Sequence, residues 1–180
     1  MKISEMLARN ARIYPGEIAL IERNFTDQTR RAVTWGEFDE KTNMVANALI
    51  ERGIKKGDKV LHIMFNSIEW LTVYFGIIRT GAWVVPLNYR FFPKDIKYCA
   101  DISEAKMLIF GEEFADRVEV IISDLHTVKD YIIVGEKKLK YAENLKNVVA
   151  SASPKDPKVY IADEDECGLY FTSGTTGEPK

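Results

Sequence analysis

Apolar residues recur along most of this chain with the spacing of helices, and short apolar runs lie between the helical stretches. The spacing is clearest after Thr34, where Phe38, Val45 and Leu49 share one side of a helix. The pattern predicts helices over residues 3–14, 34–53, 67–79, 93–100 and 112–125. It predicts strands over residues 17–23, 59–65, 82–85, 106–110, 131–134 and 168–171, and it pairs the first with residues 32–33 in a hairpin.

Residues with known preferences for helix ends support these boundaries. Thr34 and Glu37 have the spacing of a capping box, in which each side chain binds a free backbone N–H at the helix start. Asn66 with Glu69 is expected to cap the helix over residues 67–79 in the same way. Gly53 is expected to end its helix in a left-handed conformation. In the first helix, the expected apolar side consists of Met6, Leu7 and Ile13.

Strands and helices that alternate strictly indicate a parallel sheet with helices on both faces. The short apolar strands lack polar alternation, as strands buried on both faces do. We therefore expect an α/β fold with a doubly wound, flavodoxin-like layout. Residues 1–33 form an N-terminal helix and hairpin, 34–134 the βα units, 135–165 a surface connection, and 166–180 a strand followed by a loop.

Composition narrows the class of protein. The 180 residues include 25 basic and 27 acidic side chains, a net charge of −2 that gives no argument for binding nucleic acid. No stretch approaches the ~20 consecutive apolar residues that a membrane helix requires. The two cysteines, Cys99 and Cys167, have no metal spacing and make no disulfide framework, so a reducing, cytoplasmic location is expected. His62 lies inside an apolar strand and is expected to be a core histidine with its polar groups satisfied.

The chemistry of the chain is concentrated in residues 170–180, YFTSGTTGEPK. Glycines let the backbone approach a ligand closely, and hydroxyls and backbone N–H groups can donate to phosphate oxygens. A lysine at the end adds a positive charge. The candidate phosphate-binding residues are Thr172, Ser173, Gly174, Thr175, Thr176, Gly177 and Lys180.

A flexible linker, a Walker A element and a dinucleotide-binding loop are the alternative interpretations of these residues. Runs of Gly, Ser and Thr also form flexible linkers. Here, however, the apolar residues 168–171 predict a strand that leads straight into the loop, and α/β proteins place phosphate sites at such strand ends. The loop is not a Walker A element, because no lysine and Ser or Thr directly follow Gly177. It also lacks the spacing of the dinucleotide fingerprint.

The stretch YFTSGTTGEPK resembles the phosphate-loop signature of the adenylate-forming superfamily, which includes acyl- and aryl-CoA synthetases. Two further stretches resemble the same family: residues 33–38 with 48–60, and residues 66–70 with 77–88. After Pro86 and Leu87, peptide synthetases usually carry an Asp-Pro pair, whereas this chain has Asn88, Tyr89 and Arg90, which is more similar to fatty-acyl-CoA ligases.

The resemblance implies a two-step reaction: a carboxylate attacks ATP to form an acyl-adenylate, and a thiol, usually CoA, then displaces AMP. It implies that Thr172 also helps to hold Mg²⁺. The family's metal-binding glutamate, ribose-binding aspartate and C-terminal lysine would all follow Lys180, so residues 1–180 contain no catalytic residue and match the front of the large domain.

We therefore expect an N-terminal fragment of an ATP-dependent acyl-CoA ligase, with a fatty acid as the expected substrate, that is inactive without its C-terminal part. The surface on which that part would pack could make the fragment a homo-oligomer. The alternative is a stand-alone, non-catalytic module that binds a nucleotide or a protein.

Overall fold

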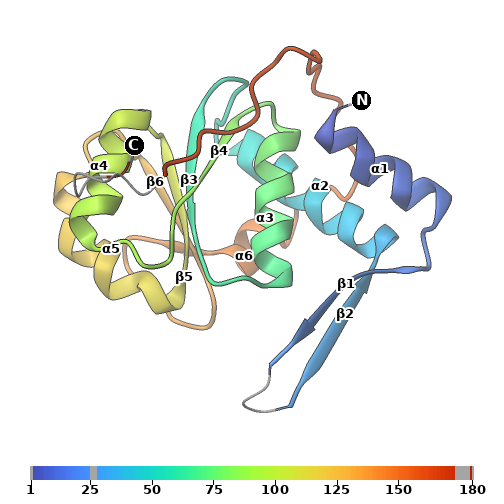
Figure 1. The fold of residues 1–180 in the computed structure, drawn as a ribbon, viewed down its shortest axis with the longest axis horizontal. Coiled ribbons are helices and arrows are strands. Elements are labelled where there is room, and N and C mark those ends of the chain that lie inside the picture. The colour runs from blue at the N-terminus through green and yellow to red at the C-terminus, as the bar shows by residue number, and fades with distance from the viewer. Residues whose placement is uncertain (1, 25–27, 173–178, 180) are drawn as a thin grey trace.

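The computed structural model describes residues 2–24, 28–172 and 179 (Figure 1). Its helices are α1 (Ile3–Ile13), α2 (Trp35–Glu51), α3 (Ile68–Arg79), α4 (Pro93–Ser103), α5 (Ala115–Ile121) and α6 (Leu145–Val149). Its strands are β1 (Ile18–Arg23), β2 (Arg30–Thr34), β3 (Lys59–Ile63), β4 (Trp83–Pro86), β5 (Met107–Gly111), β6 (Asp130–Val134) and β7 (Glu143–Asn144). No helix in the described ranges combines the length and apolarity needed to cross a bilayer.

Strands β3 to β7 form a single parallel sheet in the order β4–β3–β5–β6–β7. Numbered along the chain within this sheet, the order is 2-1-3-4-5, which is the flavodoxin-like arrangement. The doubly wound fold expected from the sequence is therefore confirmed. The order reverses between β3 and β5, because the chain first adds β4 on one side of β3 and then continues on the other side with β5.

Helices cover both faces of the sheet (Figure 1). On one face, α4 and α5 pack against alternate strand residues such as Leu61 and Phe110. On the other face, α2, α3 and α6 pack against the residues between them, such as Val60 and Ile109. All four side chains are fully buried, which explains why the strands lack polar alternation.

The helix starts follow the expected capping chemistry with one correction. Thr34 Oγ1 accepts from the Glu37 N–H at 3.2 Å, and Glu37 Oε2 accepts from the Thr34 N–H at 2.8 Å, so this capping box is confirmed. The cap of α3 is Ser67 rather than Asn66: Ser67 Oγ accepts from the Trp70 N–H at 3.0 Å. The expected helix over residues 112–125 is broken into a 3-10 turn (Glu112–Phe114), α5, and a second 3-10 turn (Ile122–Asp124).

Helix α1 lies against α2 and contributes little to the core. Of the three residues expected on its apolar side, Leu7 is buried, whereas Met6 and Ile13 are exposed. Leu7 packs with Val33, Phe38 and other residues in a small cluster separate from the two cores of the main sheet.

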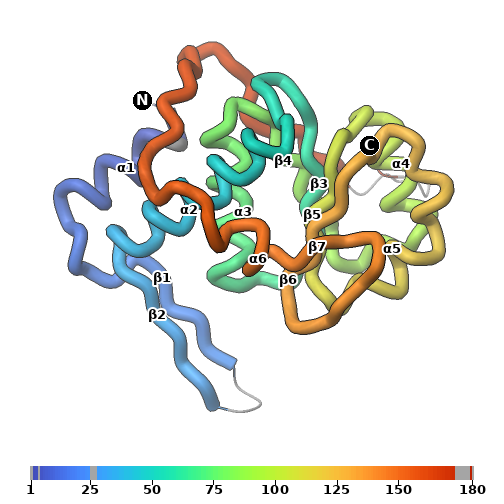
Figure 2. The backbone as a smooth tube through the Cα atoms, turned by 180° about the vertical axis from the view of Figure 1, so that it is seen from behind, coloured from blue at the N-terminus to red at the C-terminus, as the bar shows by residue number. Residues whose placement is uncertain are grey.

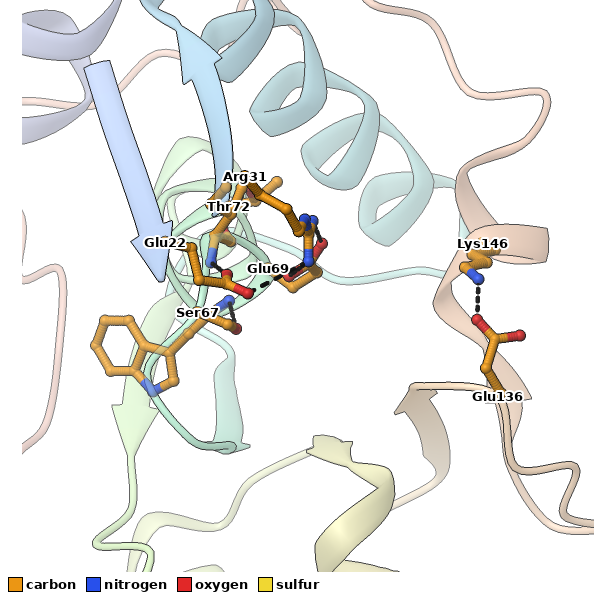
Figure 3. A network of polar contacts seen from close by, with 9 residues as sticks. Glu22, Arg31, Ser67, Glu69, Thr72, Glu136 and Lys146 are labelled. Carbon is orange, nitrogen blue, oxygen red and sulfur yellow. Dashed lines mark hydrogen bonds and ion pairs between the residues drawn. The ribbon is translucent and has the colours of Figure 1, made fainter. Parts of the chain in front are cut away.

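The antiparallel hairpin of β1 and β2 projects away from the parallel sheet (Figure 1). Its junction with the body combines apolar packing, in the small cluster that holds Leu7, with polar contacts. Glu22 Oε2 accepts from the Ile68 N–H at the start of α3 at 2.7 Å, and Arg31 forms ion pairs with Glu22 and Glu69 (Figure 3). A carboxylate is favourable at this position because the first N–H groups of a helix are unpaired and carry partial positive charge.

Replacing Glu22 with glutamine is expected to loosen the hairpin. The amide keeps the shape but loses the charge that faces the α3 N-terminus and Arg31, so we expect a loss of about 1 kcal/mol in the free energy of unfolding. Amide hydrogen exchange in β1 and β2 should become faster. The matched control is Glu17→Gln at an exposed position at the foot of the same hairpin, and equal exchange in both variants would contradict the role given to Glu22.

Residues 135–165 contain more structure than the expected surface connection. Strand β7 extends the sheet, and α6 follows it closely along the chain (Figure 2). Leu145 of α6 is buried in the same core cluster as residues of α2. Arg52, at the end of α2, donates to Asp130 at 2.6 and 2.7 Å and to Glu143 at 2.7 Å, which ties α2 to the first residues of β6 and β7. Farther along, Asn47 Nδ2 donates to the carbonyl oxygens of Ser153 and Lys155.

Candidate functional site

The carboxyl ends of β3 and β5 lie next to each other where the strand order reverses. In doubly wound folds this point opens a crevice in which ligands bind. The backbone after β3 continues through Phe65, and the backbone after β5 through Glu112 and Glu113. Glu113 Oε1 accepts from the Phe65 N–H at 3.1 Å, so the loops that follow the two strands are bonded directly to each other.

The Glu112 carboxylate makes the same kind of contact with the loop after β6, the strand on the other side of β5. Its Oε2 accepts from the N–H groups of Glu136 at 2.6 Å and Lys137 at 2.8 Å, in the loop that follows β6. Both hydrogen bonds lower the pKa of the Glu112 carboxyl, and the one from the Lys137 N–H has the larger effect. The two neighbouring carboxylates therefore brace the loops after β3 and β6 against the end of β5.

Two glycines make room for these carboxylates. A Cβ placed on Gly111 would lie 2.5 Å from the carboxylate oxygens of Glu113. A Cβ placed on Gly135 would lie 2.5 Å from the Glu112 carboxylate, and Gly135 has a φ of +139°, which other residues rarely adopt. This arrangement was not predicted from the sequence, although two acidic residues directly after a buried strand were a visible signal.

Aromatic side chains cover part of the carboxyl edge of the sheet, which is the edge where the carboxyl ends of its parallel strands meet. Phe65 lies with its ring centroid 5.5 Å from that of Tyr89 and 5.3 Å from that of Phe114. Arg117 donates to the carbonyl oxygens of Tyr89 at 2.7 Å and Phe91 at 2.9 Å, which fixes the chain between β4 and α4. Phe65 and Tyr89 remain about half exposed, so this edge presents an aromatic surface to solvent.

The C-terminal segment runs beside β4 at the edge of the sheet (Figure 1). The Val84 N–H donates to the Cys167 carbonyl at 3.0 Å, and the Leu169 N–H donates to the Val84 carbonyl at 3.0 Å. This makes a parallel bridge between Val84 and Gly168, which is less than the strand expected over residues 168–171. The side chains of Leu169 and Phe171 pack against the α4–α5 core.

This pairing directs the chain toward the carboxyl edge, because the segment runs parallel to β4. Of the candidate phosphate-binding residues, Thr172 is described, and it follows the bridge after Leu169, Tyr170 and Phe171. Ser173, Gly174, Thr175, Thr176, Gly177 and Lys180 lie outside the described residues, so their predicted role stays a prediction.

The described ranges hold no cluster of three or more His, Cys, Asp or Glu side chains able to bind a metal. The resemblance implies Mg²⁺ at Thr172. Magnesium is commonly held by few protein oxygens together with water and substrate phosphates, so one hydroxyl of Thr172 fits such a role as a partial ligand.

His62 departs from the sequence-based expectation. The side chain is fully buried, but neither ring nitrogen has a hydrogen-bond partner among the described residues. The ring centroid lies 4.8 Å from that of Trp70 in α3. Burial lowers the pKa of His62 to about 3. It is a core histidine as expected, but its polar groups are not satisfied.

The fold and its carboxyl edge define the chain as a doubly wound α/β domain of the kind that binds ligands at the ends of its strands. A scan against family models matches the AMP-binding enzyme model over residues 7–180. The chain belongs to the AMP-binding enzyme family, and the resemblance found in the sequence is confirmed.

Curated relatives of this chain are CoA ligases. It is 32% identical over 156 residues to a medium/long-chain-fatty-acid–CoA/3-oxocholest-4-en-26-oate–CoA ligase of Mycobacterium marinum, a match that covers 82% of this chain and 28% of the relative. It is also 32% identical to a 3-hydroxybenzoate–CoA/4-hydroxybenzoate–CoA ligase of Thauera aromatica, with 83% of this chain and 29% of the relative covered. The chain therefore spans less than a third of the length of these relatives.

A solved structure agrees with this assignment. The anthranilate CoA ligase AuaEII, in complex with anthranoyl-AMP, matches 98% of this chain and 33% of its own chain, with a TM-score of 0.89 and 27% identity.

Proposed function

We propose that this chain is the N-terminal part of an ATP-dependent acyl-CoA ligase, which activates a carboxylic acid as an acyl-adenylate and transfers the acyl group to CoA. The observation that carries the proposal is the bridge between Val84 and Gly168, which leads Thr172 to the carboxyl edge of the sheet. The family match and the CoA ligases among the relatives support the same reaction.

In this proposal, Thr172 begins a loop that holds the phosphates of ATP. Ser173, Gly174, Thr175, Thr176, Gly177 and Lys180 would supply the remaining hydroxyls, backbone N–H groups and positive charge. Fixed donors of this kind stabilise the negative charge that develops on the departing pyrophosphate. Bound Mg²⁺ would contribute further neutralisation of the phosphate oxygens.

We propose a fatty acid as the substrate. The support is the sequence after β4, Asn88-Tyr89-Arg90, and the medium/long-chain-fatty-acid ligase among the relatives. An aromatic acid is the competing class, since another relative acts on hydroxybenzoates. We place the ligase in the cytoplasm, in keeping with Cys99 and Cys167 being free thiols. The proposed ligase continues beyond Lys180. We propose that residues 1–180 alone are inactive. We also propose that they associate with each other through the surface that the C-terminal part of the ligase would cover.

The proposal is tested by acid-dependent exchange of pyrophosphate into ATP. The full native chain is assayed with a panel of aliphatic and aromatic acids, and we expect exchange with medium- or long-chain fatty acids. Thr172→Val should lower the exchange rate at least about tenfold, because a hydroxyl that meets a charged group is lost. Residues 1–180 alone should give no exchange.

The matched control is Thr127→Val, which removes a buried hydroxyl remote from the carboxyl edge and should leave exchange unchanged. A full native chain that exchanges pyrophosphate with none of the acids would contradict the ligase proposal. If such a chain still bound ATP, a nucleotide-binding module would be favoured instead.

A further inference from the structure

A pair of tyrosines joins the C-terminal segment to α3. The hydroxyl of Tyr74, from α3, is hydrogen-bonded to the hydroxyl of Tyr170. Tyr170 lies two residues before Thr172 and is 57% exposed, so the core does not fix its position. The two backbone hydrogen bonds that join this segment to β4 both lie at or before Leu169. The tyrosine contact therefore acts closer to Thr172 than the sheet pairing does.

The ring of Tyr170 folds back over its own segment. A Cβ placed on Gly168 would lie 3.0 Å from Tyr170 Cε2 and 3.1 Å from the Val84 carbonyl oxygen. The glycine thus leaves space for the tyrosine ring beside β4. A larger residue at this position would push on the ring or on the backbone of β4.

Tyr74 is itself held firmly. Its ring is stacked on Trp70 with centroids 5.2 Å apart and an interplanar angle of 13°, and Trp70 in turn lies against the buried His62. Phe75 meets the Tyr74 ring edge-on at 5.6 Å. Burial, followed by the hydrogen bond with Tyr170, raises the pKa of Tyr74, so this phenol keeps its proton at neutral pH.

We propose that Tyr74 is a positioning residue, which holds Tyr170 and thereby Thr172 in the arrangement that binds the triphosphate of ATP. This inference rests on the function proposed above. Tyr74 touches no reacting atom. Its effect is to restrict the segment before ATP arrives, so that less conformational freedom is lost on binding.

The test compares Tyr74→Phe, Tyr170→Phe and the double variant in the full native chain. Each single variant removes one hydroxyl and keeps the ring, so the fold and the stacking are retained. We expect each to raise the KM for ATP about fivefold in pyrophosphate exchange, with kcat changed less than about twofold, as the loss of one hydrogen bond predicts. The double variant should be no worse than either single variant, because both remove the same contact.

Tyr141→Phe is the matched control. The Tyr141 hydroxyl donates to the Ala115 carbonyl at 3.3 Å and not to the C-terminal segment, and its loss should leave the KM for ATP unchanged. A second measurement is amide hydrogen exchange of residues 168–172, which should be faster in Tyr74→Phe than in the wild type and unchanged in Tyr141→Phe.

The outcomes separate this inference from the proposed function. An active wild type in which Tyr74→Phe has an unchanged KM for ATP, or in which the two single effects add, overturns the positioning role alone. A wild type with no acid-dependent exchange overturns the ligase proposal, and only one that also binds no ATP in calorimetry overturns the role of Tyr74 in binding ATP. In that case hydrogen exchange still shows whether Tyr74 restrains the segment.

Discussion

Replacing Arg79 with alanine is expected to lower the free energy of unfolding by about 3 kcal/mol, because the change leaves the partners of a buried charge unpaired. Arg79, the last residue of α3, is 6% exposed. Its guanidinium donates to Asn43 Oδ1 at 2.6 Å and to Asp39 Oδ1 at 2.8 Å, both on α2. The side chain of Asp39 is 22% exposed, so water can relieve part of the loss there.

Urea denaturation of the purified variant measures this effect. Lys97→Ala is the control, because it breaks an exposed ion pair with Asp101 on the surface of α4 and should not change the midpoint measurably. A loss below about 1 kcal/mol for Arg79→Ala would mean that α2 and α3 are held together mainly by their apolar contacts.

Replacing His62 with leucine is expected to stabilise the protein, and to do so more strongly in acid. The buried imidazole has no hydrogen-bond partner among the residues that the structure describes, so its removal should gain about 1 kcal/mol at pH 7.5, where the ring is neutral in both folded and unfolded states. Burial lowers the pKa of His62 to about 3, whereas the unfolded chain should titrate near the ordinary value of 6.5.

The sign of the pH effect follows from these two pKa values. Below pH 6.5 the unfolded state binds a proton that the folded state does not, so acid favours unfolding until the pH reaches the folded pKa. At pH 5 the wild type should have lost about 2 kcal/mol through this one residue, and the leucine variant none. The gain from His62→Leu should therefore rise from about 1 kcal/mol at pH 7.5 to about 3 kcal/mol at pH 5.

Carboxylates that titrate in the same range act on both proteins and cancel in the difference. Thr42→Val is the matched control: Thr42 is also fully buried, and its hydroxyl has no partner in the described part of the chain. It does not titrate, so its effect on stability should be the same at both pH values. A pH-independent gain for His62→Leu would show that the imidazole becomes protonated without unfolding.

Much of the fold could be predicted from the sequence, because its strands and helices have strong local signals. The strands of the main sheet up to β6 were visible as apolar runs, and the Thr34–Glu37 capping box marked the start of α2. Strand β7 was missed because two polar residues, Glu143 and Asn144, show no periodicity. Asn66 and Ser67 are neighbouring residues with similar capping chemistry, and only the backbone path decides that Ser67 Oγ reaches the Trp70 N–H.

Less of the candidate site than of the fold could be predicted from the sequence. A phosphate loop is predicted from residue types alone and stays a prediction, and the structure adds the bridge that leads Thr172 to the carboxyl edge. The bracing roles of Glu112 and Glu113 were not predictable, because their hydrogen-bond partners come from loops 24 and 48 residues away. The contact between Tyr74 and Tyr170 spans 96 residues and was hidden for the same reason.

Because the Glu113 carboxylate packs on Gly111, a mutation at either position is expected to change the effect of a mutation at the other. The atoms nearest to a methyl group at residue 111 would be the far end of the flexible Glu113 side chain, so the protein could accommodate the methyl group by swinging Glu113 aside. That movement would release the Phe65 N–H in the loop after β3. A substitution at Gly111 is therefore expected to show epistasis with substitutions at residue 113: harmful while the glutamate is present, and nearly neutral once a shorter side chain has replaced it.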